Sequence, residues 1–433
     1  MTAGTPLRVS VTALGCKVNY AEMADLAGRL AAAGCEVVAD DRPADVRVLN
    51  SCTVTVAADA TTRQRLRRLR RADPGAHIVL TGCSVDGNPR TYLTQDPNGQ
   101  RALPDGVDAV FTNLEKGAIT DYVLQIASQR DALASAATDA PLRSRAFIKV
   151  QDGCNHRCTY CSVWRARGAA GSVPIADVRD QVARAVGAGH AEVVLTGVDL
   201  GSYGREHGTT LAHLTRVLLD DLGARARIRL SSVNSNDVTA ELIELNAHPQ
   251  LCSHWHMPLQ SGSDSILRAM HRGYRRAQYL RVCTALRALD ASTEFTSDVM
   301  VAFPGESDLD HASTLSLIAE TEMLAVHTFR YSPRENTPAA ELGGRVGDMT
   351  ARRRSAEVRR AAKTSGRARL QRALGSRQRV VWDGVEAGVA HGIAATYLEV
   401  VATASAATRA GGLDLVEVDG IDGHLLHARL VGT

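Results

Sequence analysis

Three cysteines stand within the eight-residue run from Cys154 to Cys161, and their spacing is the feature of the chain most able to do chemistry. Cys154, Cys158 and Cys161 are separated by three and then two residues, and the aromatic residue Tyr160 comes just before the last of them. A 4Fe-4S cluster normally takes four thiolates, so three leave one iron open. An open iron beside a reducible cluster can hold S-adenosylmethionine, and one electron then cleaves that cofactor to a carbon radical.

A structural zinc site is the alternative for these thiols, with His156 as a further ligand. Closed zinc sites usually combine two short pairs of ligands, and no second pair follows in the sequence. The spacing of the thiols, together with the aromatic residue, resembles the radical S-adenosylmethionine superfamily. This resemblance favours the iron–sulfur interpretation.

The first segment of the chain, to about Pro141, alternates strands and helices and predicts an open parallel α/β sheet. The strands are expected at Leu7–Leu14, Glu36–Ala39, Asp45–Asn50 and His77–Leu80, and the helices at Val18–Ala33 and Ala57–Ala72. Pro74 and Gly75 end the second helix. Ligands of such sheets bind beyond the carboxyl ends of the strands.

Three more cysteines, Cys16, Cys52 and Cys83, each follow the carboxyl end of one of these expected strands. Taken singly, each would more often be a buried core cysteine. Because all three fall at equivalent places, we expect them to converge and form a second three-cysteine cluster site. The remaining three cysteines show no such pattern and are expected to be packing residues: Cys35, Cys252 and Cys283.

The sequences around these three cysteines resemble the motifs of the methylthiotransferase N-terminal domain. The matching segments are Leu14–Asn19, Asn50–Thr55 and Leu80–Cys83. Within that family they look most like the branch that methylthiolates threonylcarbamoyladenosine beside the tRNA anticodon. The resemblance implies two 4Fe-4S clusters, one at Cys154, Cys158 and Cys161 that generates the radical from S-adenosylmethionine, and one at Cys16, Cys52 and Cys83 that holds the sulfur to be transferred.

The central segment, about Arg145 to Arg369, predicts six strand–helix units that form an open, partial (β/α)6 barrel, the radical S-adenosylmethionine domain. Its strands are expected at Ala146–Val150, Glu192–Leu195, Arg227–Leu230, His254–Met257, Phe295–Val301 and Val326–Tyr331. The cysteine loop directly follows the first strand. Glycine- and serine-rich turns follow the later strands, at the edge where this geometry places ligand groups.

Several residues at those turns resemble the family's contacts to S-adenosylmethionine. Thr196 and Gly197 resemble the segment that contacts the methionine amino group, and Val301 and Phe303 belong to a segment that looks like the adenosine-side motif. The resemblance extends the set of cofactor-binding residues to Tyr160, Ser231 and Gln260. Tyr160 is expected either to pack beside the adenine or to serve structural packing.

The last segment predicts a small antiparallel β-barrel, with strands at Gln378–Trp382, Leu398–Ala402 and Leu413–Val418. By position it resembles the family's C-terminal substrate-recognition (TRAM-like) barrel. The expected domains are therefore 1–141, 142–370 and 371–433. After Val380 seven acidic residues oppose Arg409 and Arg429, which would suit a basic peptide or protein as a partner.

Two basic runs favour a nucleic-acid partner instead. Six arginines lie between Thr61 and Ala72, and eleven basic residues stand against one acid, Glu357, between Arg352 and Arg379. Helices of this kind can follow a phosphate backbone, or they can be ordinary solvated faces. The net charge of the whole chain, +3, does not distinguish these possibilities.

The composition predicts a cytoplasmic enzyme of 433 residues with no membrane segment and no secretion signal. Nine cysteines, an odd number, favour a reducing compartment and metal binding. The leading hypothesis is a tRNA methylthiotransferase that receives electrons from a reductant such as flavodoxin or ferredoxin. The alternatives are methylthiolation of a peptide or protein residue, and a non-catalytic, metal-stabilised RNA-binding protein.

Overall fold

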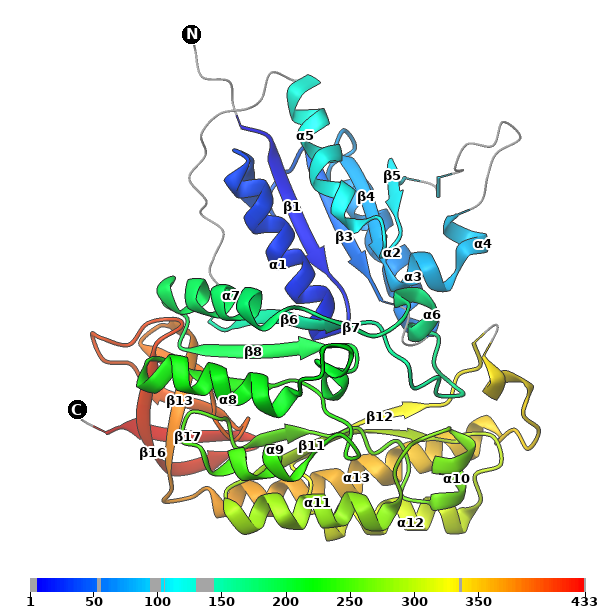
Figure 1. Cartoon of the computed structure of the whole chain (residues 1–433), viewed down its shortest axis with the longest axis vertical. Coiled ribbons are helices and arrows are strands. Elements are labelled where there is room, and N and C mark those ends of the chain that lie inside the picture. The colour runs from blue at the N-terminus through cyan, green and yellow to red at the C-terminus, as the bar shows by residue number, and fades with distance from the viewer. Residues whose placement is uncertain are drawn as a thin grey trace. The chain divides into compact units, whose positions relative to one another are not determined.

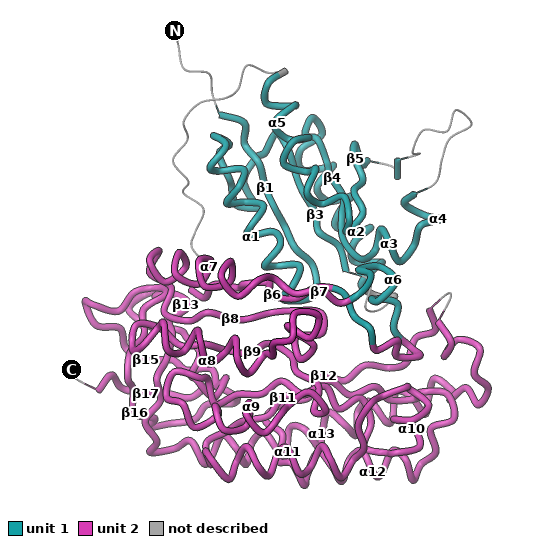
Figure 2. Tube along the Cα trace, viewed as in Figure 1, with its two compact units in different colours: residues 1–142, 153–155, 161–169 teal, residues 143–152, 156–160, 170–433 magenta. Residues whose placement is uncertain are grey.

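The computed structural model describes residues 6–52, 56–93, 103–104, 106–129, 144–334 and 337–431. The chain divides into two compact units (Figure 2). The first contains Met1–Leu142 and two short pieces that flank part of the cysteine loop, Gly153–Asn155 and Cys161–Ala169. The second contains Arg143–Asp152, His156–Tyr160 and Ala170–Thr433. The cysteine loop is thus shared between the two units.

The first unit is built on a five-stranded parallel sheet of order β2-β1-β3-β4-β5. Its strands are β1 (Arg8–Ala13), β2 (Glu36–Val38), β3 (Val46–Ser51), β4 (His77–Gly82) and β5 (Ala109–Phe111). Its helices are α1 (Lys17–Ala32), α2 (Val56–Ala72), α3 (Cys83–Gly87), α4 (Pro89–Tyr92), α5 (Ile119–Gln129) and α6 (Val163–Arg167). All six residues of β3 are buried, as expected of a central parallel strand covered on both faces.

Helix α1 illustrates why the sequence folds in this way. Val18, Met23, Leu26 and Leu30 recur at helical spacing and are buried, so one face of the helix packs on the sheet. Leu26 and Leu30 share an apolar core with β1 and with α5. Strand β5 and helix α5 were not predicted from the sequence, because a three-residue strand gives too little periodic signal.

The second unit contains six parallel strands in the order expected of an open, partial barrel. The strands are β6 (Ala146–Asp152), β8 (Glu192–Gly197), β9 (Arg227–Leu230), β10 (His254–His256), β11 (Glu294–Val301) and β12 (Ala325–Arg330). They form two hydrogen-bonded sheets. Two single parallel bridges, from Ile228 to Leu251 and from Ser232 to His256, join the sheets between β9 and β10. A short strand, β7 (Gly171–Ser172), pairs antiparallel with β6. The predicted barrel is confirmed.

Helices cover the outside of these strands (Figure 1). They are α7 (Ile175–Gly187), α8 (Leu211–Leu222), α9 (Ala240–Glu244), α10 (Asp264–Ala269), α11 (Arg276–Leu289), α12 (Asp308–Glu320) and α13 (Asp348–Arg372). Helix α12 begins with a capping box, in which Ser307 and Asp310 satisfy each other's backbone N–H groups. In α8, the Thr210 hydroxyl accepts a bond of 3.1 Å from the His213 backbone N–H.

The chain ends in a closed five-stranded barrel, called here the C-terminal barrel. Its strands are β13 (Arg377–Glu386), β14 (Val389–Ala394), β15 (Glu399–Thr403), β16 (Leu413–Asp422) and β17 (Leu425–Leu430). The predicted barrel is confirmed, with one parallel pairing, β15 with β17, among antiparallel ones. Strands β14 and β17 were not predicted. Gly392 lies inside β14, where glycine weakens the strand signal, and a side chain there would collide with the Val381 carbonyl.

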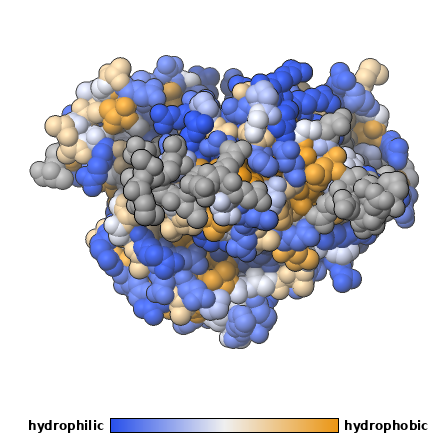
Figure 3. All heavy atoms as spheres, turned by 90° about the horizontal axis from the view of Figure 1, so that it is seen from above, coloured by the Kyte–Doolittle hydropathy of each residue, from blue (hydrophilic) through white to orange (hydrophobic). Residues whose placement is uncertain are grey.

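Apolar and polar residues are mixed on the face drawn in Figure 3. Large exposed apolar side chains occur singly, among them Leu114, Leu309 and Met349. Within the part of the chain that the structure describes, every helix is too short or too polar to cross a lipid bilayer.

Candidate active site

Cys16, Cys52 and Cys83 lie at one edge of the first unit's sheet. They follow β1, β3 and β4, which are neighbours in the sheet, and all three strands run in the same direction. Cys52 and Cys83 directly follow the paired residues Ser51 and Gly82. The predicted placement of these thiols beyond the carboxyl ends of the strands is confirmed. Of the matching motif around Cys52, residues 53–55 lie outside the described residues.

Close backbone approach brings the first two of these loops together. Gly15 has φ of +89°, and a Cβ there would lie 2.5 Å from the Cys52 Cβ and Sγ atoms. The Asn19 side-chain amide then donates to the Leu14 carbonyl at 2.8 Å and to the Ser51 carbonyl at 2.9 Å. A side chain at position 15 is therefore incompatible with the observed spacing of the loops.

A buried ionic network lies beside this edge. The Glu22 carboxylate accepts bonds from Lys116 Nζ at 2.5 Å, Asn50 Nδ2 at 3.1 Å and Arg167 Nη1 at 2.8 Å. Burial lowers the pKa of Lys116, and the charge of Glu22 opposes this shift. Arg167 also donates from Nε to Cys83 Sγ at 3.3 Å, a contact that would stabilise a negatively charged sulfur ligand.

Arg167, Glu22 and Lys116 were not predicted from the sequence. They are far apart in the chain, and Arg167 belongs to the segment that follows the other cysteine motif. A basic residue six positions after Cys161 gives no signal of its own. Only the packing of α6 within the first unit brings it to Cys83, and the Asn113 amide supports that packing by donating to the Ala166 carbonyl at 3.1 Å.

The cysteine loop begins directly after β6. Gly153 has φ of +70°, and a side chain there would collide with the Ala169 carbonyl. The Cys154 N–H donates to the Gly168 carbonyl at 3.1 Å, which closes the loop on itself. Cys154 and Cys161 are half-buried, and the Cys161 sulfur accepts a bond of 3.4 Å from the Val163 N–H.

Cys158 and its neighbours belong to the second unit. Cys158 is buried, and its sulfur accepts a bond of 3.4 Å from Arg272 Nη1. Thr159 is held by its backbone N–H, which donates to the Met270 carbonyl at 3.1 Å. Tyr160 packs against an apolar group made of Ile266, Met270, Phe303 and Ala339. The packing role expected for Tyr160 thus has observed contacts, and its contact with adenine stays a prediction.

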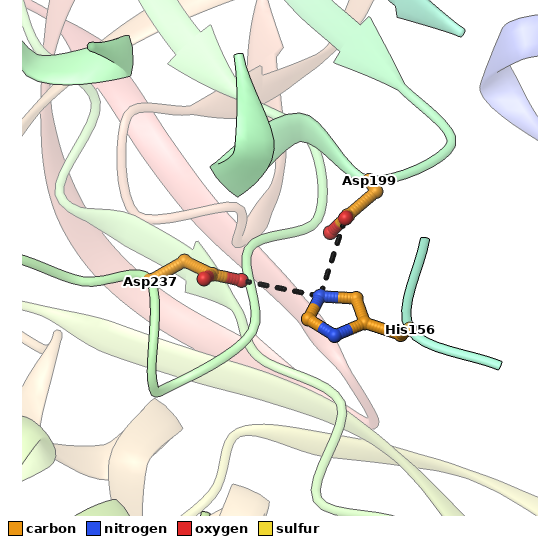
Figure 4. A group of neighbouring side chains, drawn as sticks. All are labelled: His156, Asp199 and Asp237. Carbon is orange, nitrogen blue, oxygen red and sulfur yellow. Dashed lines mark ion pairs between the residues drawn. The ribbon is translucent and has the colours of Figure 1, made fainter. Parts of the chain in front are cut away.

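His156, within the cysteine loop, contacts two carboxylates (Figure 4). Its Nε2 lies 3.2 Å from Asp199 Oδ2 and 3.8 Å from Asp237 Oδ2. Arg205 Nη2 lies 2.6 Å from the other oxygen of Asp237. Hydrogen bonding to Asp199, and then to Asp237, raises the pKa of His156 to about 10. These contacts link the loop to the segments that follow β8 and β9.

This arrangement bears on the zinc alternative. The Nε2 atom of His156 is directed at Asp199 and Asp237, so a metal bound by this histidine would have to be held through Nδ1. Asp199 is held further by Asn234 Nδ2 at 3.2 Å, and its backbone N–H donates to Gln151 Oε1 at 2.7 Å. Nε2 of His156 is thus engaged by carboxylates that are themselves held in place.

The predicted cofactor-side residues lie at the carboxyl edge of the partial barrel. Thr196 and Gly197 end β8, and Ser231 follows β9. Val301 and Phe303 are fully buried at and just after the end of β11. Gln260 has φ of +61°, and its backbone N–H donates to the Asp298 carbonyl at 2.8 Å, beside β11.

Two hydroxyls at this edge are suited to a polar ligand. Ser231 Oγ and Ser235 Oγ are buried, and neither has a hydrogen-bond partner among the described residues. Buried hydroxyls are normally bonded, so orphaned ones indicate a missing partner. Ser235 was not among the predicted contacts, because a serine in a polar loop carries no specific signal.

The two basic runs are only partly exposed. In α13, Arg354 is buried and pairs with Glu306 at 2.8 Å, and Arg369 is buried and pairs with Glu294 at 2.8 Å. Exposed cations without a partner among the described residues recur along one face of the helix, at Arg360, Lys363 and Arg367. In the first run, Arg63, Arg67, Arg68 and Arg71 are exposed on α2. The expectation that these helices can follow a phosphate backbone stays a prediction, and in α13 it narrows to the stripe of Arg360, Lys363 and Arg367.

Comparison with known proteins agrees with this architecture. Residues 148–318 match the model of the radical SAM superfamily, and residues 8–102 match an uncharacterised protein family, UPF0004. The threonylcarbamoyladenosine tRNA methylthiotransferase MtaB of Thermotoga maritima is 34% identical over 385 residues, which are 86% of each chain. The chain belongs to the radical S-adenosylmethionine methylthiotransferase family. It is an enzyme of that kind, and the family uses S-adenosylmethionine and 4Fe-4S clusters.

Other members of the methylthiotransferase family are similarly related. The Chlamydia pneumoniae protein of the same name as the Thermotoga enzyme is 32% identical and covers 95% of this chain and 97% of its own. The tRNA-2-methylthio-N(6)-dimethylallyladenosine synthase of Frankia alni is 32% identical over 80% of this chain and 72% of its own. Among solved structures, the radical S-adenosylmethionine methyltransferase TsrM from Kitasatospora setae covers 77% of this chain and 75% of its own with a TM-score of 0.56. At 14% identity, that likeness shows the fold alone.

Proposed function

We propose that this methylthiotransferase inserts a methylthio group at C2 of threonylcarbamoyladenosine next to the tRNA anticodon. The observation that carries the proposal is the similarity to relatives named for this substrate over nearly the full length of both chains. The peptide and non-catalytic alternatives are not favoured by the comparisons. A tRNA substrate would place the enzyme in the cytoplasm, with a reductant such as flavodoxin or ferredoxin as electron donor.

We assign the two clusters to the two cysteine triplets. Cys154, Cys158 and Cys161 would hold the cluster that binds S-adenosylmethionine, and Cys16, Cys52 and Cys83 would hold the second one. The donor sets fit, because each triplet supplies three thiols and leaves one iron open. Arginine N–H groups on Cys83 and Cys158 would offset the negative charge of the ligands.

The cofactor-binding set would comprise Tyr160, Thr196, Gly197, Ser231, Gln260, Val301 and Phe303. The orphaned Ser231 hydroxyl supports a polar contact at this edge, and Ser235 is a further candidate. Buried Val301 and Phe303 would exclude water from the adenosine side. Tyr160 supports that apolar wall through its packing on Phe303 and Met270.

When bound, the cofactors supply a 5′-deoxyadenosyl radical, which abstracts hydrogen from an unactivated C–H bond, and the methylthio group that replaces it. The chain's own residues position these groups. His156 fixes the cysteine loop to Asp199 and Asp237, and Arg272 fixes Cys158. No protein base has to deprotonate the substrate carbon, so the contribution of the protein is geometry and exclusion of water.

Three of the seven acidic residues of the C-terminal barrel have partners in the structure. Asp383 accepts from Ser144, and Asp414 accepts from Trp382 Nε1 at 2.7 Å. Glu417 pairs with Arg429 at 3.0 Å. Because these carboxylates already have partners, the case for a basic peptide as substrate is weakened.

Nucleoside mass spectrometry of tRNA from a deletion strain tests the proposal. The 2-methylthio derivative of threonylcarbamoyladenosine should disappear, and the gene for wild-type protein should restore it. A Cys52→Ala gene should fail to restore it, whereas Cys35→Ala, which alters a buried packing cysteine of the same unit, should succeed. If the deletion strain kept the modified nucleoside and lost a methylthiolated peptide, the substrate would be a peptide or protein and not tRNA.

A further inference from the structure

Four polar side chains lie on the inner face of the partial barrel, and none of them belongs to the proposed cofactor-binding set. Val299, on β11, is part of the apolar core that the outer helices cover. Because side chains alternate along a strand, Thr296 and Asp298 point to the opposite side, the inside of the barrel. Thr296 pairs in register with His256 on β10, and residues paired in this way share one face. Asp298 pairs in the same way with His327 on β12. These four residues are called here the inner-face group.

The inner face differs between the two ends of the strands. Near the start of β8 and β9, Glu192 and Arg229 are paired at 2.7 Å and their side chains are 0% exposed, so they fill the inside of the barrel. Farther along the strands, the side chains of His256 and Asp298 keep 15% and 28% of their surface exposed, and His327 is exposed. Solvent therefore reaches the inner-face group, and a ligand can do the same.

Hydrogen bonds hold most of the inner-face group in place. His256 Nδ1 lies 2.9 Å from Thr296 Oγ1, and its Nε2 lies 3.3 Å from Asp298 Oδ2. The His327 ring lies beside this pair, with its centroid 6.0 Å from that of His256. Within the described part of the chain, the ring nitrogens of His327 have no hydrogen-bond partner. His327 is thus the member of the group whose polar atoms are left for a ligand.

The inner-face group lies deeper in the barrel than the proposed cofactor contacts. Asp298 and His327 each stand three residues before the end of their strand. At about 3.3 Å for each residue, this places them roughly 10 Å from the edge where Val301 ends β11. Thr196 and Ser231 lie at the same edge, at the ends of β8 and β9. A group held by His327 would therefore lie beside the cofactor and would not displace it.

We propose that His327 donates a hydrogen bond to an oxygen of the threonylcarbamoyl group and thereby selects this nucleoside over one with an apolar N6 substituent. This inference rests on the proposed function. The threonylcarbamoyl group has a carbonyl, a hydroxyl and a carboxylate, all of which accept hydrogen bonds. A dimethylallyl group in the same place has no polar atom. A site that bonds to one substrate discriminates against an analogue without the bonding group, because the polar side chain is then left unpaired.

His256, Thr296 and Asp298 have a different part in this recognition. Because His256 is held through both ring nitrogens, it is a positioning residue for the His327 ring beside it. The Asp298 carboxylate is directed at His256, so this imidazole stands between its negative charge and an acceptor group of the substrate. The specificity-determining contact is assigned to His327 alone.

Binding of three anticodon stem-loops to the cluster-loaded enzyme tests the proposal. The loops differ only in the target nucleoside, which is adenosine, threonylcarbamoyladenosine or dimethylallyladenosine. The affinity for each modified loop, divided by that for the adenosine loop, isolates the contribution of the N6 substituent. The test variant is His327→Leu, and His327→Gln keeps an N–H donor. The control is His213→Leu, at an exposed histidine of α8. Thermal unfolding verifies that the variants fold.

The wild-type enzyme should bind the threonylcarbamoyladenosine loop about tenfold more tightly than the adenosine loop. In His327→Leu this ratio should fall to about twofold, with the affinity for the adenosine loop unchanged. The dimethylallyladenosine loop should bind to His327→Leu at least as tightly as to wild type, because an apolar side chain then meets an apolar substituent. His327→Gln should keep most of the wild-type ratio, and His213→Leu should keep all of it.

Two results would overturn the proposal. One is an unchanged ratio in His327→Leu. The other is an equal loss for all three loops, because His327 would then support packing or general RNA binding. The proposed function has its own outcome: if the wild-type enzyme neither prefers nor modifies the threonylcarbamoyladenosine loop, the substrate assignment fails and the inference fails with it. If wild type modifies that loop and His327→Leu keeps the ratio, only the role of His327 is wrong.

Discussion

Cys16, Cys52 and Cys83 come from the loops after three different strands, whereas Cys154, Cys158 and Cys161 share one loop after a single strand. The first triplet forms only if β1, β3 and β4 lie side by side in the correct order. The second has its three cysteines on one loop, which is held by local bonds such as the one from Cys154 to Gly168 and by distant residues such as Arg272. We therefore expect the first site to depend more strongly on long-range packing than the second.

The two sites also differ in the part of the chain that supplies the arginine next to the cysteine sulfur. Arg167 contacts Cys83 from a segment far along the chain, within a buried network that includes Glu22. Arg272 contacts Cys158 from the loop after α10, and it also stacks its guanidinium over Tyr274 at 4.9 Å. Both arginines donate to a cysteine sulfur, but among the described residues only Arg167 has a buried carboxylate partner. Loss of Arg167 should therefore cost stability as well as chemistry.

The largest effects should come from removing each triplet. Replacing Cys154, Cys158 and Cys161 with Ala should leave about half the iron and abolish reductive cleavage of S-adenosylmethionine. Replacing Cys16, Cys52 and Cys83 should leave 5′-deoxyadenosine formation measurable and abolish the methylthio product. Iron content and product analysis check both. If either triple variant held as much iron as wild type, its ligand assignment would be wrong.

Gly15→Ala should damage the first site with little effect on the second. The new Cβ would lie 2.5 Å from Cys52, at a φ of +89° that alanine disfavours. Iron should fall toward about half, as in the triple variant of that site, while 5′-deoxyadenosine still forms. Gly28→Ala is the matched control, since nothing lies within 4 Å of that helical position. Full iron content in Gly15→Ala would contradict the close approach.

The positions of both cysteine triplets at strand ends could be predicted from the sequence, but the side chains that contact the cysteines could not. The strand ends that carry Cys16, Cys52 and Cys83 follow from hydrophobic periodicity, which is local. The partners of those cysteines do not, because the contact from Arg167 to Cys83 spans 84 positions. Likewise, His156 stands inside a recognisable motif, yet nothing local indicates that its Nε2 atom faces Asp199 and Asp237.

Charge patterns were the least reliable guide. The basic run from Arg352 to Arg379 favoured a nucleic-acid partner, but Arg354 points inward to Glu306. A helix with arginine at consecutive positions must direct some of them toward its packed face. Periodicity along the helix, which separates Arg354 and Arg369 from Arg360, Lys363 and Arg367, would have been the better indicator.

Arg167→Leu should destabilise the first unit by roughly 3 kcal/mol, because it leaves Glu22 buried with less positive charge around it. Adding Glu22→Gln should recover part of that loss, since the uncompensated carboxylate is removed. Arg165→Leu, on the exposed side of the same helix, is the control. Thermal and denaturant unfolding measure the effect. An equal loss in the single and double variants would show that charge compensation is not the cause.

His156→Phe should give the smallest effect, confined to the second site. The phenyl ring cannot donate to Asp199 and Asp237, so the cysteine loop loses its tie to the ends of the neighbouring strands. We expect 5′-deoxyadenosine formation to slow between about threefold and about tenfold, because a small misplacement of reacting groups is costly. Iron content should stay near that of wild type, since no ligand is removed.

A conservative replacement separates positioning from simple packing at this residue. His156→Gln keeps an N–H donor within reach of Asp199 and should restore most of the rate that His156→Phe loses. His213→Gln, at an exposed histidine of α8, should behave as wild type. If the Gln and Phe variants were equally slow, the bond to Asp199 would not be the feature that matters, and the local loop alone would set the second site. If His156→Phe lost as much iron as a cysteine variant does, the contacts to Asp199 and Asp237 would be needed to assemble the second site. The two sites would then depend on long-range packing to a similar degree.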